Sequence, residues 1–212
     1  MRLKDWLKTG AVHALAAIGG SFLYGVMMYM MDAEFDFSTF VEVSMIYLLF
    51  FGAFLNLVLI LTVQKQNLPL ALSFGATRKE AFWGMQCYRI VYAVLIMAAA
   101  AMMLLLLEEP YGMAAVLLPI GLAAVLLLGA IGSVGGVMGI RYGKGAAIAA
   151  GVMMGIVSMG IGIFVGIWMV KHGLIGGLPE WTLWLFPVIG LVAHIGSMVL
   201  EHKTIFKYNV KL

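Results

Sequence analysis

Few side chains in this chain of 212 residues are placed to do metal, phosphate or nucleophilic chemistry. The single cysteine, Cys87, excludes both an internal disulfide framework and a cysteine-based metal site. No pair of histidines has the H-E-x-x-H spacing of a zinc enzyme. Gly143-Lys144 lacks the earlier glycine and the following Ser or Thr of a phosphate-binding loop. We therefore expect no metal ion and no ATP hydrolysis on this chain.

The best argument for an enzyme comes from His194 and from the glycine-rich segment at 132–139. "VAHIG" and "GSVGGVMG" resemble the histidine and serine motifs of rhomboid intramembrane proteases, which implies a Ser–His dyad. Aligning the glycines places Val134 at the nucleophile position, and Ser133 lies about 100° away around a helix. The glycine motif also falls at the predicted cytoplasmic end of its span, and the first outer loop is too short for this family. A protease is therefore the weaker alternative.

Long apolar segments must position these residues. The chain is 64% hydrophobic and 11% charged, whereas soluble domains carry about 25% charged residues. Segments of roughly 18 residues or more can span a bilayer as helices. We predict one all-α integral membrane domain over 1–212, with spans at roughly 10–31, 40–63, 90–107, 112–139, 145–170 and 181–200.

The basic residues predict the orientation, because Lys and Arg of short loops stay in the cytoplasm. Twelve of the thirteen Lys and Arg residues fall on one side of the six predicted spans, and only Lys171 falls on the other. Seven of the ten acidic residues lie on the side of Lys171. We therefore expect both termini to be cytoplasmic.

The start of the chain, "MRLKDWLKTG", predicts a short interfacial helix before the first span. Leu3 and Trp6 would lie in the headgroup layer beside Arg2 and Lys4. The apolar run that follows is longer than a signal-peptide core and lacks a clear cleavage site.

The loop at 67–86 contains two sets of helix start and stop signals. Asn67 can cap a short apolar helix over 68–74, with Pro69 in its first turn. Gly75 can supply the left-handed turn that ends a helix. Thr77 and Glu80 form a T-x-x-E capping box, which predicts a new helix from Arg78 into the third span, as far as 107.

This loop and one other segment resemble a known family of membrane proteins, and the length and six-span layout of the whole chain are similar to it as well. "ALSFGATRKEAFWGMQ" and "GSVGGVMGIRYGKG" resemble the second-to-third-span loop and the fourth-span exit of ABC-2-type transporter permeases from Gram-positive bacteria. The outer segment "KHGLIGGLPE" is too short for the large external domain of some exporters.

The resemblance implies a permease subunit that is not itself an enzyme. It implies a second permease subunit and a separate ATP-binding subunit, which holds the ATP and Mg²⁺. It favours export, of a peptide, lipid or other amphipathic substrate. The residues that it assigns to coupling with the ATP-binding subunit are Leu68, Leu70, Leu72, Phe74, Gly75, Thr77, Arg78, Lys79 and Glu80.

Small residues in the fourth and fifth spans predict close helix packing, because residues four apart share a helix face. Packing within one subunit is favoured over a dimer interface, although both can hold. The glycines concerned are Gly132, Gly136, Gly151, Gly155, Gly162 and Gly166.

Three polar residues of the predicted spans are candidates for polar contacts within the membrane: Glu42, Asn56 and His194. Glu42 ends a second T-x-x-E box that begins at Thr39, so a capping role is expected for it. Asn56 lies at mid-bilayer depth, where an interhelical hydrogen bond is expected. His194 is expected to be a packed or pore-facing residue. A substrate-binding subunit of the vitamin-uptake type remains an alternative, but it needs more polar groups near the outer face than the chain offers.

Overall fold

The computed structural model describes residues 3–31, 36–107, 110–143 and 185–207, and the isolated positions 145, 149 and 183. Within these residues every regular element is an α-helix. Apart from two isolated positions, the predicted fifth span at 145–170 lies outside the described residues. Its predicted packing glycines, Gly151, Gly155, Gly162 and Gly166, lie outside them too.

Five helices of the described part are long and apolar enough to cross a membrane. They are α1 (Leu3–Met31), α2 (Phe37–Ser73), α3 (Arg78–Leu104), α4 (Pro110–Tyr142) and α7 (Leu185–Lys207). The all-helical, membrane-type architecture predicted from the sequence is therefore confirmed for these residues. The number of spans and the membrane side of the termini stay predictions.

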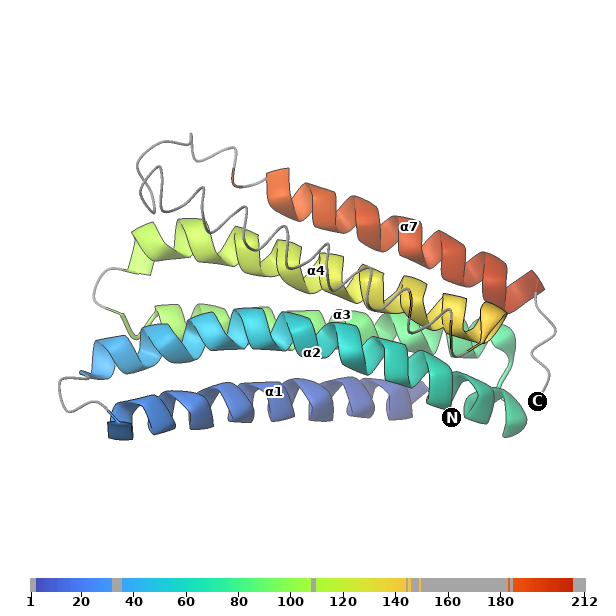
Figure 1. The fold of residues 1–212 in the computed structure, drawn as a ribbon, viewed down its shortest axis with the longest axis horizontal. Helices are drawn as coiled ribbons and strands as arrows, with labels where there is room; N and C mark the ends of the chain where they lie inside the picture. Colours follow the sequence, from blue (N-terminus) through green and yellow to red (C-terminus); the bar gives the residue numbers. More distant parts are fainter. Residues whose placement is uncertain are drawn as a thin grey trace.

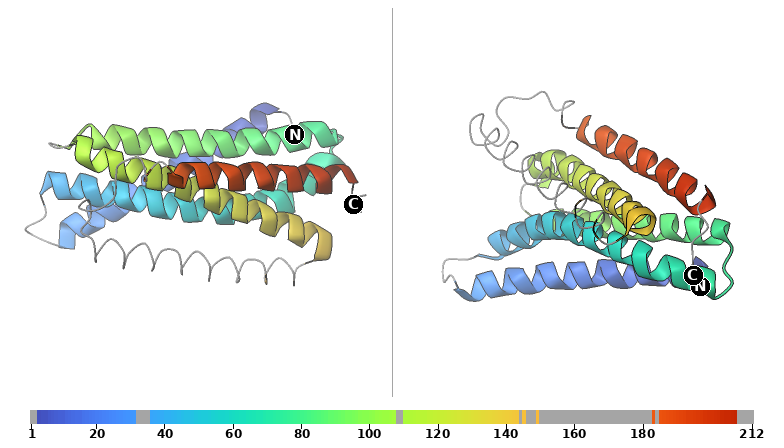
Figure 2. Two further views of the ribbon diagram at one scale, coloured as in Figure 1. Left: turned by 90° about the horizontal axis from the view of Figure 1, so that it is seen from above. Right: turned by 45° about the vertical axis from the view of Figure 1, so that its right-hand side comes forward.

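The helices run side by side in an elongated bundle, in which α1 to α4 alternate in direction and α7 runs in the same direction as α4 (Figures 1 and 2). α1 packs against α2 and α3, α2 packs against α4, and α7 packs along α4 while meeting α3 only over a short stretch. One end of the bundle contains the start of α1, the turn between α2 and α3, and the end of α7 (Figure 1). We call this the hairpin end.

Two apolar clusters hold the described helices together. The middle of the bundle is filled by side chains such as Met45, Leu48 and Ile96. A second cluster at the hairpin end joins Trp6 of α1 to Phe82 of α3 and Ile205 of α7. The two ends of the described chain are therefore packed against the same part of the molecule.

The separate interfacial helix predicted before the first span is wrong, because α1 is continuous from Leu3 to Met31. Trp6 is fully buried in protein instead of lying in a headgroup layer. Its indole ring occupies the space left by Gly84, where a Cβ atom would collide with it. Close packing of α1 on α3 thus extends the helix back to its first turns.

The separate short helix predicted at 68–74 is also wrong. α2 continues without a break through Asn67 and Pro69 to Ser73, so Asn67 is not a helix cap. Proline removes one backbone hydrogen bond inside a helix, which normally weakens it. Here Leu68 and Ala71, each 1% exposed, are packed into the hairpin-end cluster, and this burial favours continuation of the helix.

The start of α2 differs from the predicted capping box as well. The N-cap is Asp36, whose Oδ1 accepts a hydrogen bond of 2.7 Å from the backbone N–H of Thr39. This bond stabilises the carboxylate and lowers the pKa of Asp36. Thr39 and Glu42 therefore lie inside the helix, and Glu42 is half-buried on its surface.

Candidate functional site

The turn between α2 and α3 is a fixed structure. Gly75 adopts φ +82°, in the left-handed region that glycine favours, as the sequence predicted. Its N–H donates to the carbonyl of Leu72 at 3.1 Å, and the N–H of Ala76 donates to the carbonyl of Ala71 at 3.0 Å. These two bonds make a Schellman motif, which satisfies the last carbonyls of α2.

The predicted capping box at the start of α3 is confirmed. The backbone N–H of Thr77 donates to Glu80 Oε2 at 2.8 Å, and the N–H of Glu80 donates to Thr77 Oγ1 at 3.2 Å. α2 ends and α3 begins within a few residues, and each helix end is capped. We call residues 65–83 the α2–α3 hairpin.

The structure divides the predicted coupling residues between two environments. Leu68 is buried in the hairpin-end cluster and Leu72 is half-buried against it. Leu70 and Phe74 point outward, with 52% and 79% of their surface exposed. Trp83 of α3, which the sequence analysis did not include, is 52% exposed as well.

The charged residues of the hairpin are placed differently. Lys79 and Glu80 are exposed on the first turn of α3. Arg78 Nη1 donates to the backbone carbonyl of Phe206 at 3.1 Å, close to the end of α7. Phe206 also forms ring contacts with Phe82 and stacks on His202. The hairpin is therefore joined directly to the last turns of α7.

A cluster of buried polar side chains lies where the hairpin meets the bundle, and the sequence analysis did not predict it. At its centre Arg89 Nη1 and Glu201 Oε1 form an ion pair at 3.2 Å, with side chains only 2% and 0% exposed. Glu201 also accepts hydrogen bonds from Gln64, Gln86 and Ser133. One carboxylate of α7 is thus held by donors from α2, α3 and α4.

The guanidinium of Arg89 extends this cluster along α7. Its Nη2 donates to Ser197 Oγ at 2.9 Å and lies 3.0 Å from Nδ1 of His194. Because a guanidinium can only donate, His194 must accept at Nδ1, which places the ring proton on Nε2. We call the seven residues the polar cluster: Gln64, Gln86, Arg89, Ser133, His194, Ser197 and Glu201.

A signal for the polar cluster is present in the sequence. Gln86 and Arg89 are three residues apart, and His194, Ser197 and Glu201 follow at intervals of three and four. Residues at these spacings share one face of a helix. The predicted spans at 90–107 and 181–200 exclude Arg89 and Glu201 by one residue each, so a buried contact between the two was not expected.

The other predicted residues make packing contacts or hydrogen bonds between neighbouring helices, and Gly136 does so against Gln64 of the polar cluster. Asn56 is 3% exposed, and its Nδ2 donates to the backbone carbonyl of Val125 on α4 at 2.9 Å, an interhelical bond of the expected kind. Gly132 and Gly136 face α2, where added Cβ atoms would meet Leu57 and Gln64. These two glycines pack within the subunit.

The arrangement of Ser133 and His194 differs from that of a Ser–His dyad. The Ser133 hydroxyl donates to Glu201, and Nδ1 of His194 faces Arg89. Among the described residues, no group of three or more His, Cys, Asp or Glu side chains could hold a metal ion.

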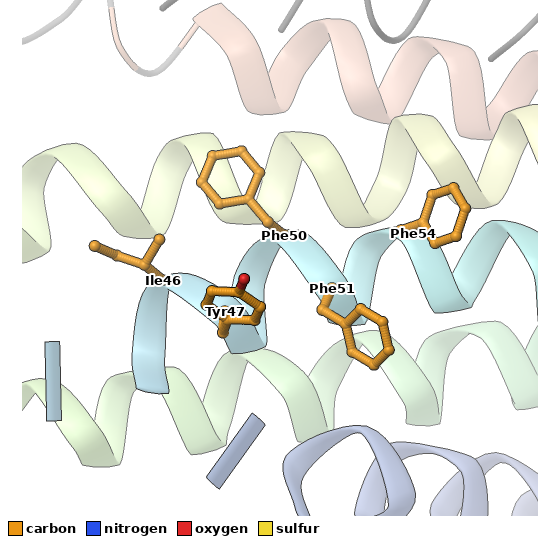
Figure 3. Close-up of a pocket in the computed structure, with 5 residues that line it drawn as sticks. All are labelled: Ile46, Tyr47, Phe50, Phe51 and Phe54. Atoms are coloured by element: carbon orange, nitrogen blue, oxygen red, sulfur yellow. The ribbon is translucent and has the colours of Figure 1, made fainter. Parts of the chain in front are cut away.

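A shallow hollow of about 420 Å³ lies on the surface of α2 and is wholly apolar apart from one hydroxyl (Figure 3). It is lined by Ile46, Tyr47, Phe50, Phe51 and Phe54. Such a surface suits lipid chains, and it offers no polar group beyond the Tyr47 hydroxyl to orient a ligand.

Comparison of the chain with models of protein families, with curated proteins and with solved structures found no match in any of the three.

Proposed function

We propose that this chain is the permease subunit of an ATP-driven ABC transporter of a bacterial plasma membrane, coupled to a separate ATP-binding subunit through the α2–α3 hairpin. The resemblance of the hairpin sequence to ABC-2-type permeases suggests the class. The geometry of the hairpin supports it. ATP and Mg²⁺ would bind to the partner, and a second permease subunit, identical or related, would complete the pathway.

The observation that carries the proposal is the length of α2. Its 37 residues make a helix of about 55 Å, whereas the hydrocarbon core of a bilayer is about 30 Å thick. The exposed polar residues Lys65 and Gln66 mark a boundary along it. Leu70 and Phe74 lie beyond this boundary, so something other than the hydrocarbon core of the bilayer must bury their exposed apolar surface.

A groove in a protein partner is the binding site that fits this apolar surface. Two apolar side chains project from a capped hairpin, whose second helix begins with the exposed Lys79 and Glu80. Burying one large apolar side chain contributes about 1.5–3 kcal/mol, so two of them can anchor a stable contact. ATP-driven movement of the partner would then displace the hairpin, and α2 and α3 would carry that displacement toward the membrane.

The test replaces the exposed anchors and leaves the packed residues unchanged. Leu70→Asp and Phe74→Asp should each weaken binding of the ATP-binding subunit by tenfold or more, because 1.4 kcal/mol corresponds to a factor of ten. Gln66→Asp, at an exposed polar position on the same helix, should bind normally. Binding would be measured by co-purification and by ATPase activity, with membrane insertion checked for each variant.

Leu72→Asp is not a suitable variant, because Leu72 is half-buried and its loss would disturb the fold itself. If correctly inserted Leu70→Asp and Phe74→Asp proteins bind the ATP-binding subunit and transport as the wild type does, the hairpin has no coupling role.

A further inference from the structure

We propose that the polar cluster is a latch that fastens α7 to the base of the α2–α3 hairpin, so that the hairpin and α7 move as one body. The latch itself follows from contacts within this chain. Its use in transport rests on the function proposed above.

The attachment of α7 to the other described helices supports the latch. α7 packs along α4, meets α3 only over a short stretch and does not pack against α2. Even so, Glu201 of α7 accepts hydrogen bonds from Gln64 of α2 and from Gln86 of α3, and it pairs with Arg89. On this side of α7, side-chain polar contacts to α2 and α3 add to the apolar contacts of Ile205 and Phe206.

The partners of Glu201 lie at the base of the hairpin. Gln64 directly precedes Lys65, the first residue of the hairpin, and Gln86 lies three residues after Trp83, its last residue. Both arms of the hairpin therefore contribute a side chain to the same carboxylate. A displacement of either arm must move Glu201 or break its hydrogen bonds.

A second attachment joins the hairpin to α7, farther along that helix. Arg78 holds the carbonyl of Phe206, and Phe82 contacts the rings of His202 and Phe206. α7 is thus fixed to the hairpin at two levels, about one turn apart. Both attachments must break before α7 can move separately from the hairpin.

The interaction that joins Arg89 to Glu201 is a buried ion pair with surrounding hydrogen bonds. A buried ion pair is often no more stabilising than well-packed apolar side chains, because both charges must leave water. Its hydrogen bonds, however, have fixed directions and are formed or lost together. Within the described residues, Gln64 Oε1 and Arg89 Nε have no hydrogen-bond partner, although both atoms are buried.

The experiment measures the distance between the hairpin and α7 in the full chain, reconstituted alone in lipid nanodiscs. Spin labels would be placed at Ser73 and Val192, both exposed, after replacement of Cys87 by serine. Ser73 lies nine residues beyond Gln64 along α2, and Val192 lies nine residues before Glu201 along α7, in the opposite direction, which separates the two labels by roughly 25–30 Å along the bundle. Pulsed electron resonance resolves such a distance.

The latch predicts one narrow distance in the wild type. Replacing the ion pair by apolar residues of similar size, Arg89→Met with Glu201→Leu, should at least double the width of the distribution or add a second distance. The matched control is Tyr92→Phe, which removes a buried bond of 2.7 Å from Tyr92 to the carbonyl of Gly52 outside the polar cluster. Tyr92→Phe should leave the distribution unchanged.

Two results would overturn the latch: an unchanged distance in the apolar pair variant, or equal broadening in Tyr92→Phe. If gel filtration shows that the apolar variant does not fold, Glu201→Gln decides by the same criterion, since it keeps the side-chain length and removes the charge. The measurement needs neither an ATP-binding subunit nor a substrate. The latch and the proposed function can therefore fail independently.

Discussion

At the scale of single residues, the most demanding feature is the burial of Arg89 and Glu201. An ionised side chain without a partner is costly in a membrane-type interior, and such residues face one another or other protein groups. Here each charge is matched, and neutral donors from Gln64, Gln86 and Ser133 satisfy the remaining acceptor sites of the carboxylate. Stability therefore depends on keeping both members of the pair.

Arg89→Ala should lower the free energy of unfolding by about 3–5 kcal/mol, because it leaves the buried carboxylate of Glu201 without its counter-charge. Tyr92→Phe, which removes one neutral hydrogen bond, should lower it by about 1 kcal/mol. Both values can be measured by denaturant titration in mixed micelles. A smaller loss for Arg89→Ala than for Tyr92→Phe would show that the ion pair contributes little to stability.

Gly132 tests the close contact between α4 and α2. An added Cβ atom would lie 2.5 Å from the carbonyl oxygen of Leu57 and 3.0 Å from its Cα, and backbone cannot move without separating the helices. Gly132→Ala should therefore destabilise the protein by about 1–3 kcal/mol.

The control for this change is Gly19→Ala in α1, where an added Cβ atom meets nothing within 4 Å. Alanine is the better helix former there, so Gly19→Ala should be neutral or stabilise the protein by up to about 1 kcal/mol. Equal thermal stability of the two variants would contradict the packing described for Gly132.

At the scale of residues, the sequence predicts the structural features that depend only on neighbouring residues. The Thr77–Glu80 capping box and the left-handed turn at Gly75 depend on neighbouring residues, and both are present. Arg89 and Glu201 lie 112 residues apart, and nothing local indicates that they pair. Their partnership follows from tertiary packing, which one sequence alone does not specify.

At the scale of elements, α2 shows how tertiary burial overrides local signals. Asn67 and Pro69 are valid signals for a helix start, and the sequence analysis used them in that way. The helix nevertheless continues, because Leu68 and Ala71 are buried against neighbours that lie far away in the sequence. Similarly, burial of Trp6 beside Gly84 extends α1 back to its first residues.

The turn that closes the hairpin should be sensitive to a β-branched residue. Gly75 has φ +82°, and for valine the left-handed region costs about 1–2 kcal/mol. We expect Gly75→Val to reduce stimulation of the partner's ATPase activity, because the hairpin would change its shape. The protein should still insert, since the turn lies between two helices.

A matched control exists at the end of α4. Gly143 has φ +85°, so Gly143→Val introduces the same backbone strain at a turn outside the hairpin. It should leave ATPase stimulation unchanged. Equal loss in both variants would mean that strain anywhere in the chain, and not the shape of the hairpin, impairs coupling.

At the scale of the whole molecule, composition and hydropathy were sufficient to predict an all-helical membrane protein. Five helices of the described part meet the length and hydropathy needed for spanning. The orientation rests on the distribution of Lys and Arg, which a bundle of helices does not display by its shape.

The orientation predicts which positions a membrane-impermeant thiol reagent can reach. With Cys87 replaced, single cysteines at Asp36, Glu109 and Gly176 should react in intact cells. Cysteines at Lys65, Lys144 and Lys211 should react only after permeabilisation. Labelling of a cysteine at 211 from outside would contradict the six-span arrangement with cytoplasmic termini.

The central claim is that the exposed apolar tip of the α2–α3 hairpin binds an ATP-binding subunit, and site-specific photo-crosslinking in cells tests it most directly. A photoreactive amino acid at Phe74, which is 79% exposed, should form an adduct with an ATP-binding subunit, identified by mass spectrometry. The same probe at Val192, exposed on α7, should not form this adduct. Adducts at Phe74 that contain only lipid, or the same protein adduct from both positions, would contradict the claim.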